Sequence, residues 1–301
     1  MKLRLQALGI AALTWFGLFA LPASAAPLDV VASFSILADI CEHIGGDRIQ
    51  VHSLVGRDAD AHMFAPTPAD ARTIAGARLV VVNGLGFEGW IDRLVKSSGY
   101  RGPIVVATNG IDALGSGNTH VYGHGSKDDP HAWQDPANVR QYVDNIARAL
   151  TAVDPDGKAD YLANAERFKA EISALDAEIR RSFATIPAAR RKVVTTHDAF
   201  AYFGRAYALT FIAPVGVYTD AEPSAADIGN IIRQIRHEKI PAVFMETISD
   251  PRLLERISQE SGARIGGALY SDSLSSADGP APTYLDMMRH NARTLAEALA
   301  E

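Results

Sequence analysis

Four short segments of the sequence each carry one side chain of the kind that binds metal ions. They are Asp-Ala-His-Met around His62, Asp-Pro-His-Ala-Trp around His131, Thr-Thr-His-Asp-Ala-Phe around His197 and Tyr-Ser-Asp-Ser around Asp272. Successive ligands are separated by so many residues that no two of them share a helical turn or a hairpin. Only tertiary folding can bring them together. Three imidazoles and one carboxylate suit Zn²⁺, or Mn²⁺ where the carboxylate binds through both oxygens.

Each of these positions also has an ordinary structural explanation. His62 and His131 lie in loops that contain proline, where a histidine is often a surface residue. His197 follows a strand-like apolar run, and the neighbouring Asp198 is a candidate helix cap. Turn chemistry alone accounts for an aspartate such as Asp272. The metal hypothesis is favoured because all four contexts agree with one another.

The N-terminus has the pattern of a secretory signal peptide. The positive charges of Lys2 and Arg4 precede a short apolar run, and small residues at Ala23 and Ala25 predict cleavage near Ala25. The apolar run is shorter than the roughly 20 residues that span a bilayer, which argues against a membrane anchor. We therefore expect residues 1–25 to be removed and the mature protein to be periplasmic.

The composition narrows the class of protein further. The only cysteine, Cys41, excludes an intramolecular disulfide, and we expect it to be a buried apolar residue of a helix. It lies beyond the cleavage site, so it is not placed to anchor a lipoprotein, and the mature chain should be soluble. A net charge of −6 over 301 residues argues against nucleic-acid binding. We expect a monomer.

Short β-branched runs alternate with longer segments of helical period, the pattern of α/β units around mainly parallel sheets. The expected strands are 28–32, 50–54, 77–83 and 103–107 in the first half, and 192–196, 208–215, 242–246 and 263–269 in the second. The expected helices are 35–44, 68–75, 88–97, 199–205, 224–237 and 251–261, with a further helix starting at Pro136. We expect two similar α/β lobes with mainly parallel four-stranded sheets.

One long, rigid helix is expected between the lobes. Apolar residues recur there at three- and four-residue spacing: Tyr161, Ala165, Phe168, Ile172, Leu175, Ile179 and Phe183. Such a helix of about 25 to 30 residues is some 40 Å long and should restrict lobe rotation more than a flexible linker would. The predicted division is a signal peptide at 1–25, an N-terminal lobe at 26–153, the linking helix at 154–187 and a C-terminal lobe at 188–301.

The motifs resemble those of the ABC-transporter substrate-binding proteins for zinc and manganese, the ZnuA/TroA-like group. Residues 129–133 resemble the second ligand motif of that family closely, and residues 195–203 resemble the third. The first motif departs from the family pattern because Ala61 replaces the usual proline. The resemblance implies two α/β lobes joined by one long helix, with a metal site in the inter-lobe cleft. It assigns four ligands: His62 and His131 from the first lobe, and His197 and Asp272 from the second.

The resemblance also implies a function. The protein is expected to be a periplasmic receptor, not an enzyme, that captures Zn²⁺ with high affinity and delivers it to the membrane permease of an ABC importer. A metallochaperone is a second candidate partner. Histidine at the third ligand position leaves an imidazole-rich site that favours zinc, and a manganese receptor is the alternative. A secreted zinc-dependent hydrolase is less favoured, because neither His-x-x-Glu-His nor His-Glu-x-x-His occurs.

Three more residues are candidates for accessory roles. His120 and His124 lie in a Gly- and Ser-rich loop before the second motif, where they are candidates for transient metal capture. The alternative is a plain surface loop with incidental histidines. Glu246 ends a predicted strand and is a candidate to orient a ligand imidazole, the alternative being a solvated carboxylate.

Overall fold

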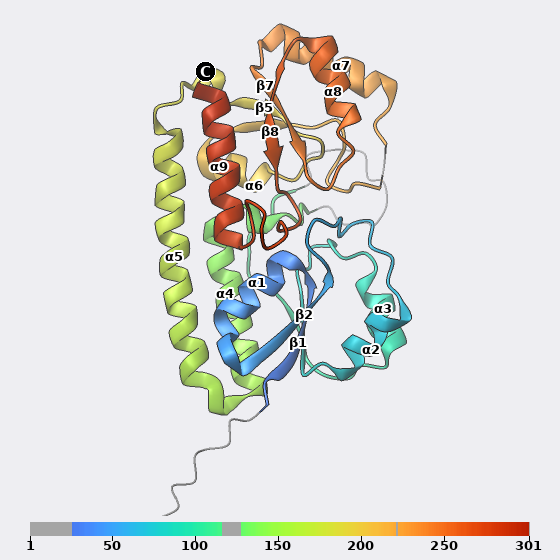
Figure 1. Ribbon diagram of the computed structural model, residues 1–301, viewed down its shortest axis with the longest axis vertical. Helices are drawn as coiled ribbons and strands as arrows, with labels where there is room; N and C mark the ends of the chain where they lie inside the picture. Colours follow the sequence, from blue (N-terminus) through green and yellow to red (C-terminus); the bar gives the residue numbers. More distant parts are fainter. Residues whose placement is uncertain (1–25, 116–127, 221, 301) are drawn as a thin grey trace, which may run out of the picture.

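Two four-stranded parallel sheets form the two halves of the molecule (Figure 1). The computed structural model describes residues 26–115, 128–220 and 222–300. The first sheet contains β1 (Leu28–Phe34), β2 (Ile49–Val55), β3 (Leu79–Val82) and β4 (Ile104–Val106). The second contains β5 (Lys192–Val194), β6 (Thr210–Ile212), β7 (Ala242–Glu246) and β8 (Arg264–Leu269). The predicted fold class is confirmed.

Both sheets have the same topology. Their strand orders are β2-β1-β3-β4 and β6-β5-β7-β8, and all the strand pairs in these two sheets are parallel. The first strand of each sheet lies between the second and the third, so the connections leave it in opposite directions. This arrangement opens a crevice at the carboxyl ends of the strands. In Figure 1 the carboxyl ends of the two sheets face each other across the middle of the molecule.

Helices flank both sheets, which explains why the central strands are apolar on both faces. All four residues of β3, for example, are buried. The helices are α1 (Ser35–Gly45), α2 (Pro68–Gly76), α3 (Ile91–Ser98), α4 (Pro136–Val153), α6 (Ala201–Tyr207), α7 (Ala225–Glu238), α8 (Arg252–Ser261) and α9 (Tyr284–Ala300). Local sequence signals determine where two of these helices begin. Thr67 with Asp70 forms a capping box at the N-terminus of α2, and Asp135 caps α4 ahead of Pro136.

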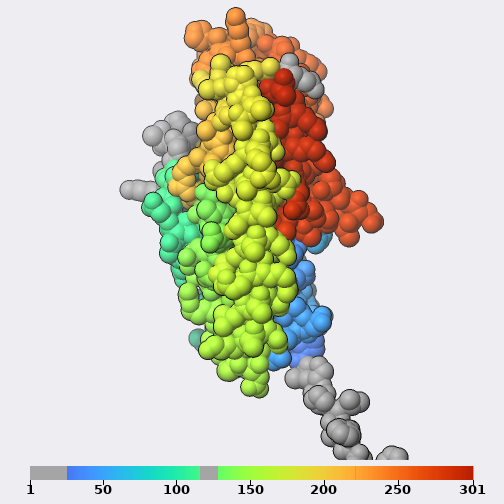
Figure 2. Space-filling view, turned by 90° about the vertical axis from the view of Figure 1, so that its left-hand side faces the viewer, coloured from blue at the N-terminus to red at the C-terminus, as the bar shows by residue number. Residues whose placement is uncertain are grey.

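The long helix α5 (Lys158–Ala184) runs along both halves of the molecule. It has 27 residues, and its buried positions are the seven apolar residues whose spacing predicted it. Figure 2 shows it as a continuous band on one face, beside α4 near its start and α9 near its end. A short 3₁₀ turn at Pro155–Gly157 precedes it, so the helix begins three residues later than Pro155. The domain boundaries at 153 and 187 stay predictions.

Several elements have shorter or shifted bounds, and β6 and α9 differ most from the sequence expectation. The strand expected at 208–215 is only three residues long as β6, because it is an edge strand and Pro214 has no N–H to continue the ladder. Helix α9 is not among the predicted helices, although its buried residues include Met288, Leu295 and Leu299 at helical spacing. It packs against β8 and α5.

Two further expectations concern Cys41 and the membrane. Cys41 is buried in α1 as expected, and burial raises the pKa of its thiol. Across the described ranges, no helix combines the length and the apolar character needed to cross a bilayer. The predicted signal peptide, residues 1–25, lies outside the described residues.

Candidate metal centre

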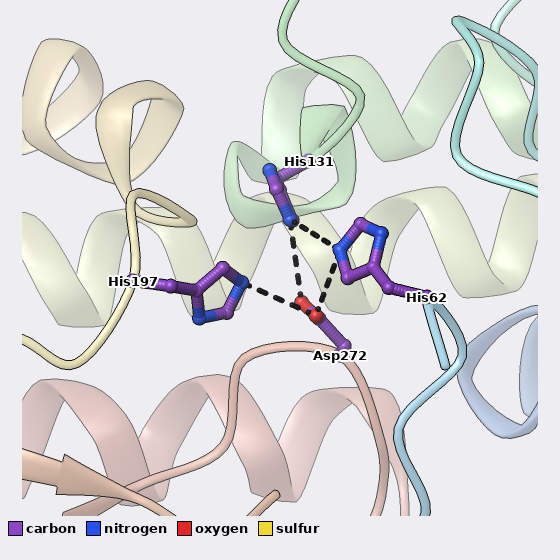
Figure 3. A group of neighbouring side chains, drawn as sticks. All are labelled: His62, His131, His197 and Asp272. Carbon is purple, nitrogen blue, oxygen red and sulfur yellow. Dashed lines mark hydrogen bonds and ion pairs between the residues drawn. The ribbon is translucent and has the colours of Figure 1, made fainter. Parts of the chain in front are cut away.

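The four predicted ligands meet between the two sheets. Each offers one donor atom, and these atoms all lie within 4.8 Å of one another: they belong to His62, His131, His197 and Asp272. Figure 3 shows the three imidazoles and the carboxylate pointing toward a common centre from four separate segments. The side chain of His62 is 2% exposed, and the other three residues are fully buried. The structure therefore encloses a three-histidine, one-carboxylate cluster.

His62 is placed by the loop that follows β2. The carboxylate of Asp60 accepts the backbone N–H of His62 (2.8 Å), and the indole of Trp90 donates to the carbonyl of Ala61 (2.9 Å). The ring of Phe87 lies edge-on, with its centroid 4.8 Å from that of the His62 imidazole. Within the described residues, the Nδ1 atom of His62 has no hydrogen-bond partner. Its backbone is thus held more firmly than its ring.

His131 lies directly before a 3₁₀ turn (Ala132–Gln134) that leads into α4. The Asp129 carboxylate accepts two hydrogen bonds from it, from the backbone N–H (2.9 Å) and from ring Nδ1 (2.8 Å). The side-chain amide of Asn83, at the end of β3, donates to the carbonyl of Pro130 (2.9 Å). A carboxylate can only accept, so Nδ1 carries the ring proton and Nε2 keeps its lone pair for the centre.

His197 follows β5 and is held by Glu246 at the end of β7. One oxygen of Glu246 accepts the backbone N–H groups of Thr196 (2.8 Å) and His197 (2.9 Å). The other oxygen forms an ion-pair contact of 2.6 Å with ring Nδ1. Glu246 is 2% exposed, so it is not the solvated strand-end carboxylate considered as the alternative. Helix capping by Asp198, the structural explanation considered for this segment, also fails, because α6 has no side-chain cap.

Asp272 lies in the segment 270–283 that connects β8 to α9, and this segment, together with the start of α9, is bonded mainly to the first lobe. The carbonyl of Ser271 accepts hydrogen bonds from the Trp133 indole (2.9 Å) and the Gln134 amide (2.8 Å). Further along, Arg57 donates to two carbonyls of the segment at 2.8 and 2.6 Å. The backbone N–H of Tyr284 donates to the Asp39 carboxylate (2.9 Å).

The division of ligands between the lobes is therefore uneven. By sequence, His197 and Asp272 both belong to the C-terminal half. By hydrogen bonding, Asp272 is attached to the first lobe together with His62 and His131, whereas His197 is held by Glu246 of the second lobe. A relative movement of the lobes would chiefly displace His197 from the other three.

The cluster has an electrostatic pattern that suits a cation. Burial raises the pKa of Asp272, but His197 and His131 outweigh that effect, and the pKa lies well below the ordinary value for aspartate. Burial also lowers the pKa of His197, yet Glu246 and Asp272 together hold that pKa well above the ordinary value for histidine. For His62, burial dominates and its pKa is lowered. In the metal-free centre the anionic form of Asp272 and the protonated form of His197 therefore favour each other.

One further observation indicates that the donor set fits a metal ion. Among the described residues, neither oxygen of Asp272 has a hydrogen-bond partner, although the residue is fully buried. Instead, the oxygens face the Nε2 atoms of His62 and His197 at 3.3 Å and of His131 at 3.6 Å. Burying a carboxylate without partners costs several kcal/mol unless a cation compensates it. A metal bound by all four residues would satisfy both oxygens.

Sequence reasoning missed Asp129 as a functional candidate, and two of the candidates that it named lie outside the described residues. Asp129 contacts His131 as closely as Glu246 contacts His197, and its place two residues before His131 was the available signal. His120 and His124 lie outside the described residues.

Comparison with known proteins agrees with the fold and places the chain in a metal-binding family. The model of the family "Zinc-uptake complex component A periplasmic" (ZnuA) matches residues 30–298. The manganese-binding lipoprotein MntA of Halalkalibacterium halodurans is 34% identical over 274 residues, or 91% of this chain and 89% of MntA. The iron-binding protein YfeA of Yersinia pestis is also 34% identical, over 90% of this chain and 86% of YfeA. The solved periplasmic zinc-binding protein TroA of Treponema pallidum has a TM-score of 0.84 at 28% identity, covering 91% and 100% of the two chains.

The class of two-lobed solute-binding proteins is defined by two α/β lobes with parallel sheets, joined by one long helix. A buried cluster of histidines and a carboxylate lies between the lobes. The chain belongs to the ZnuA family within that class. Proteins of this family are substrate-binding components of transporters rather than enzymes. The relatives' names include manganese, iron and zinc, so the family alone does not assign a metal.

Proposed function

We propose that this protein is the periplasmic metal receptor of an ABC importer and that it binds one Zn²⁺ with high affinity. The observation that carries the proposal is the meeting of four buried donors, each from a different segment, within 4.8 Å of one another. The ion would be held by His62, His131, His197 and Asp272. Capture and delivery require a site that surrounds its ion and excludes water, and the burial of these side chains provides that enclosure.

Zinc is favoured because three of the four side chains are imidazoles. The contacts of Asp129 and Glu246 leave the Nε2 atoms of His131 and His197 directed at the centre, which is the arrangement that a four-coordinate zinc ion needs. Such outer carboxylates also increase the basicity of the imidazoles, which strengthens their bonds to a borderline metal such as zinc.

Manganese is the second candidate. Both oxygens of Asp272 face the imidazoles without other partners in the described part of the chain, so a bidentate carboxylate would bring the donors to five. Oxygen ligands and coordination numbers above four suit Mn²⁺. The similarity to the manganese-binding lipoprotein MntA supports the same alternative.

A receptor fits the site better than the zinc-dependent hydrolase. A hydrolytic site needs an open coordination position and a general base beside the metal-bound water. Two further buried carboxylates beside the centre, those of Asp129 and Glu246, contact the Nδ1 atoms behind His131 and His197 rather than the space that the four ligands face. They are placed to orient imidazoles.

The proposed partner is the membrane permease of an ABC importer, with a metallochaperone as a second candidate donor of zinc. The proposed location is the periplasm, reached after cleavage near Ala25. Several relatives are named lipoproteins. In this chain the single cysteine is buried in α1, so it cannot carry a lipid anchor in the folded protein.

The test is the metal content of untagged protein purified from the periplasm of a bacterial host. Plasma mass spectrometry should find one zinc per chain, and competition with a chromophoric chelator should rank zinc above manganese. The matched control is the His131→Ala variant, purified in parallel. Parent protein that contains no metal and takes up none would refute the receptor function, whereas a preference for manganese would move the assignment to the second candidate.

A further inference from the structure

A ring of three hydrogen bonds joins the two lobes beside His131. The hydroxyl of Tyr202, in α6, accepts a hydrogen bond from Leu114 N (2.9 Å) and donates one to Asp129 O (2.9 Å). The third bond runs from Asp129 N to Leu114 O (2.7 Å). Tyr202 is fully buried, and burial raises the pKa of its hydroxyl to about 12, so it remains a donor at neutral pH.

Asp129 connects this ring to the metal centre. Its backbone takes part in the ring, while its side chain accepts hydrogen bonds from both the backbone N–H and the ring Nδ1 of His131. The residue is 1% exposed, and in such an environment a hydrogen bond to a carboxylate is strong. Rotation of the imidazole would break that bond and remove the Nε2 lone pair from the centre.

We infer that Tyr202 and Asp129 are positioning residues for His131: the Tyr202 hydroxyl fixes the segment of Asp129, and the Asp129 carboxylate fixes the tautomer and orientation of the imidazole. The inference rests on the proposed metal-binding function. It also bears on the release of the metal, because α6, which carries Tyr202, begins shortly after His197 in the second lobe. Separation of the lobes would withdraw His197 and, through Tyr202, loosen His131 in the same movement.

Tyr202→Phe tests the first step, and Tyr207→Phe is its matched control. Tyr207 lies on the same helix, is also buried, and donates to Asp176 (3.0 Å) rather than to the site. Each variant loses one buried hydroxyl, so both should lower the melting temperature of the metal-free protein by about 2–4 °C. The dissociation constant for zinc should rise by about tenfold in Tyr202→Phe and stay at the parental value in Tyr207→Phe.

Asp129→Ala and Asp129→Asn test the second step. Asparagine retains an oxygen that accepts the two N–H groups of His131, whereas alanine retains none. We expect zinc affinity to fall by about 100-fold in the alanine variant and to recover most of that loss in the asparagine variant. The visible absorption of bound Co²⁺, which reports ligand geometry, should change in Asp129→Ala and in Tyr202→Phe, but not in Tyr207→Phe.

The parent protein and His131→Ala, titrated with the same zinc indicator, separate the two ways of failing. Parent protein that binds neither zinc nor Co²⁺ would refute the proposed function itself. If the parent binds zinc and His131→Ala loses it, the metal site stands. Parental affinity and a parental Co²⁺ spectrum in both Tyr202→Phe and Asp129→Ala would then overturn the positioning role.

Discussion

Glu246 Oε2 lies 2.6 Å from Nδ1 of His197, and Oε1 of the same carboxylate accepts the backbone N–H of that histidine. One buried side chain therefore fixes both the backbone and the ring of the ligand that the second lobe supplies. Asp129 performs the same double contact on His131 in the first lobe. In each lobe, a buried carboxylate that contacts Nδ1 thus positions the ligand imidazole.

Glu246→Gln should weaken zinc binding by about 10- to 100-fold even though the side chains have the same shape. Glutamate accepts at both oxygens, whereas glutamine must place its NH₂ group against either the His197 ring or two backbone N–H donors. Chelator competition measures the loss. Glu238→Gln, which removes a charge beside Lys192 at the surface of the same lobe, is the control and should bind zinc normally. Equal affinities in the two variants would exclude a role for Glu246.

His131→Ala should lower zinc affinity by at least about 100-fold, because it removes one of four ligands and leaves the Asp129 carboxylate buried without its partner. The fold should persist, since two extensive apolar clusters, the larger of which includes residues of both sheets, hold the molecule together. His52→Ala is the control, because His52 pairs with Asp29 on an exposed edge of the first sheet. Titration calorimetry with circular dichroism checks both points, and unchanged zinc affinity in His131→Ala would remove that residue from the site.

Zinc affinity should fall as the pH falls. Burial lowers the pKa of His197, but Glu246 and Asp272 raise it well above its ordinary value, which favours the protonated ring in the metal-free protein. Zinc must displace that proton, and affinity should fall about tenfold per pH unit below the raised pKa. Burial lowers the pKa of His62, so protons compete there only at more acidic pH.

Calorimetry at neutral pH in buffers of different ionisation enthalpy should count about one proton released for each zinc bound. The control is Glu246→Gln, in which one of the two carboxylates that raise the pKa of His197 is gone and proton release should decrease. Zinc affinity that stays constant between about pH 5.5 and 7.5 would contradict a three-histidine site.

Deleting residues 118–127 should leave equilibrium zinc affinity nearly unchanged, because the four ligands lie outside that stretch. Gly115 and Asp128 are paired as an antiparallel bridge, so the two ends of the shortened connection already lie side by side. If His120 and His124 collect metal, the deletion should slow zinc acquisition from a zinc-loaded donor protein.

Stopped-flow transfer measurements test the role of that loop. The control keeps the loop and replaces only His120 and His124 by alanine, which separates the effect of the imidazoles from that of loop length. Unchanged transfer rates in both variants would leave the loop as a plain surface connection. A large fall in equilibrium zinc affinity in the variant that keeps the loop and lacks only these two imidazoles would instead mean that the four primary ligands are assigned wrongly.

Much of the architecture could be predicted from the sequence because it depends on local residue patterns. The apolar stripe from Tyr161 to Phe183 predicted the long helix, since a period near 3.6 places those residues on one buried face. The apolar run at β3 predicted a strand, and all its residues are buried because helices cover both faces of a parallel sheet. The four ligand segments were recognisable from residue type and their proline-containing or strand-end context. Even Glu246 followed from its place at the end of a strand.

Only the tertiary structure decided the contacts between residues far apart in the chain. Asp272 belongs by sequence to the second half, yet Trp133 and Gln134 bind its segment to the first lobe. The link from Tyr202 to Asp129 spans 73 residues. Sequence pattern fixes which face of an element is apolar, but hydrogen-bond partners depend on how finished elements pack. The sequence by itself therefore determined the candidate ligands and the elements that carry them, whereas packing decided which groups orient each ligand and which lobe holds it.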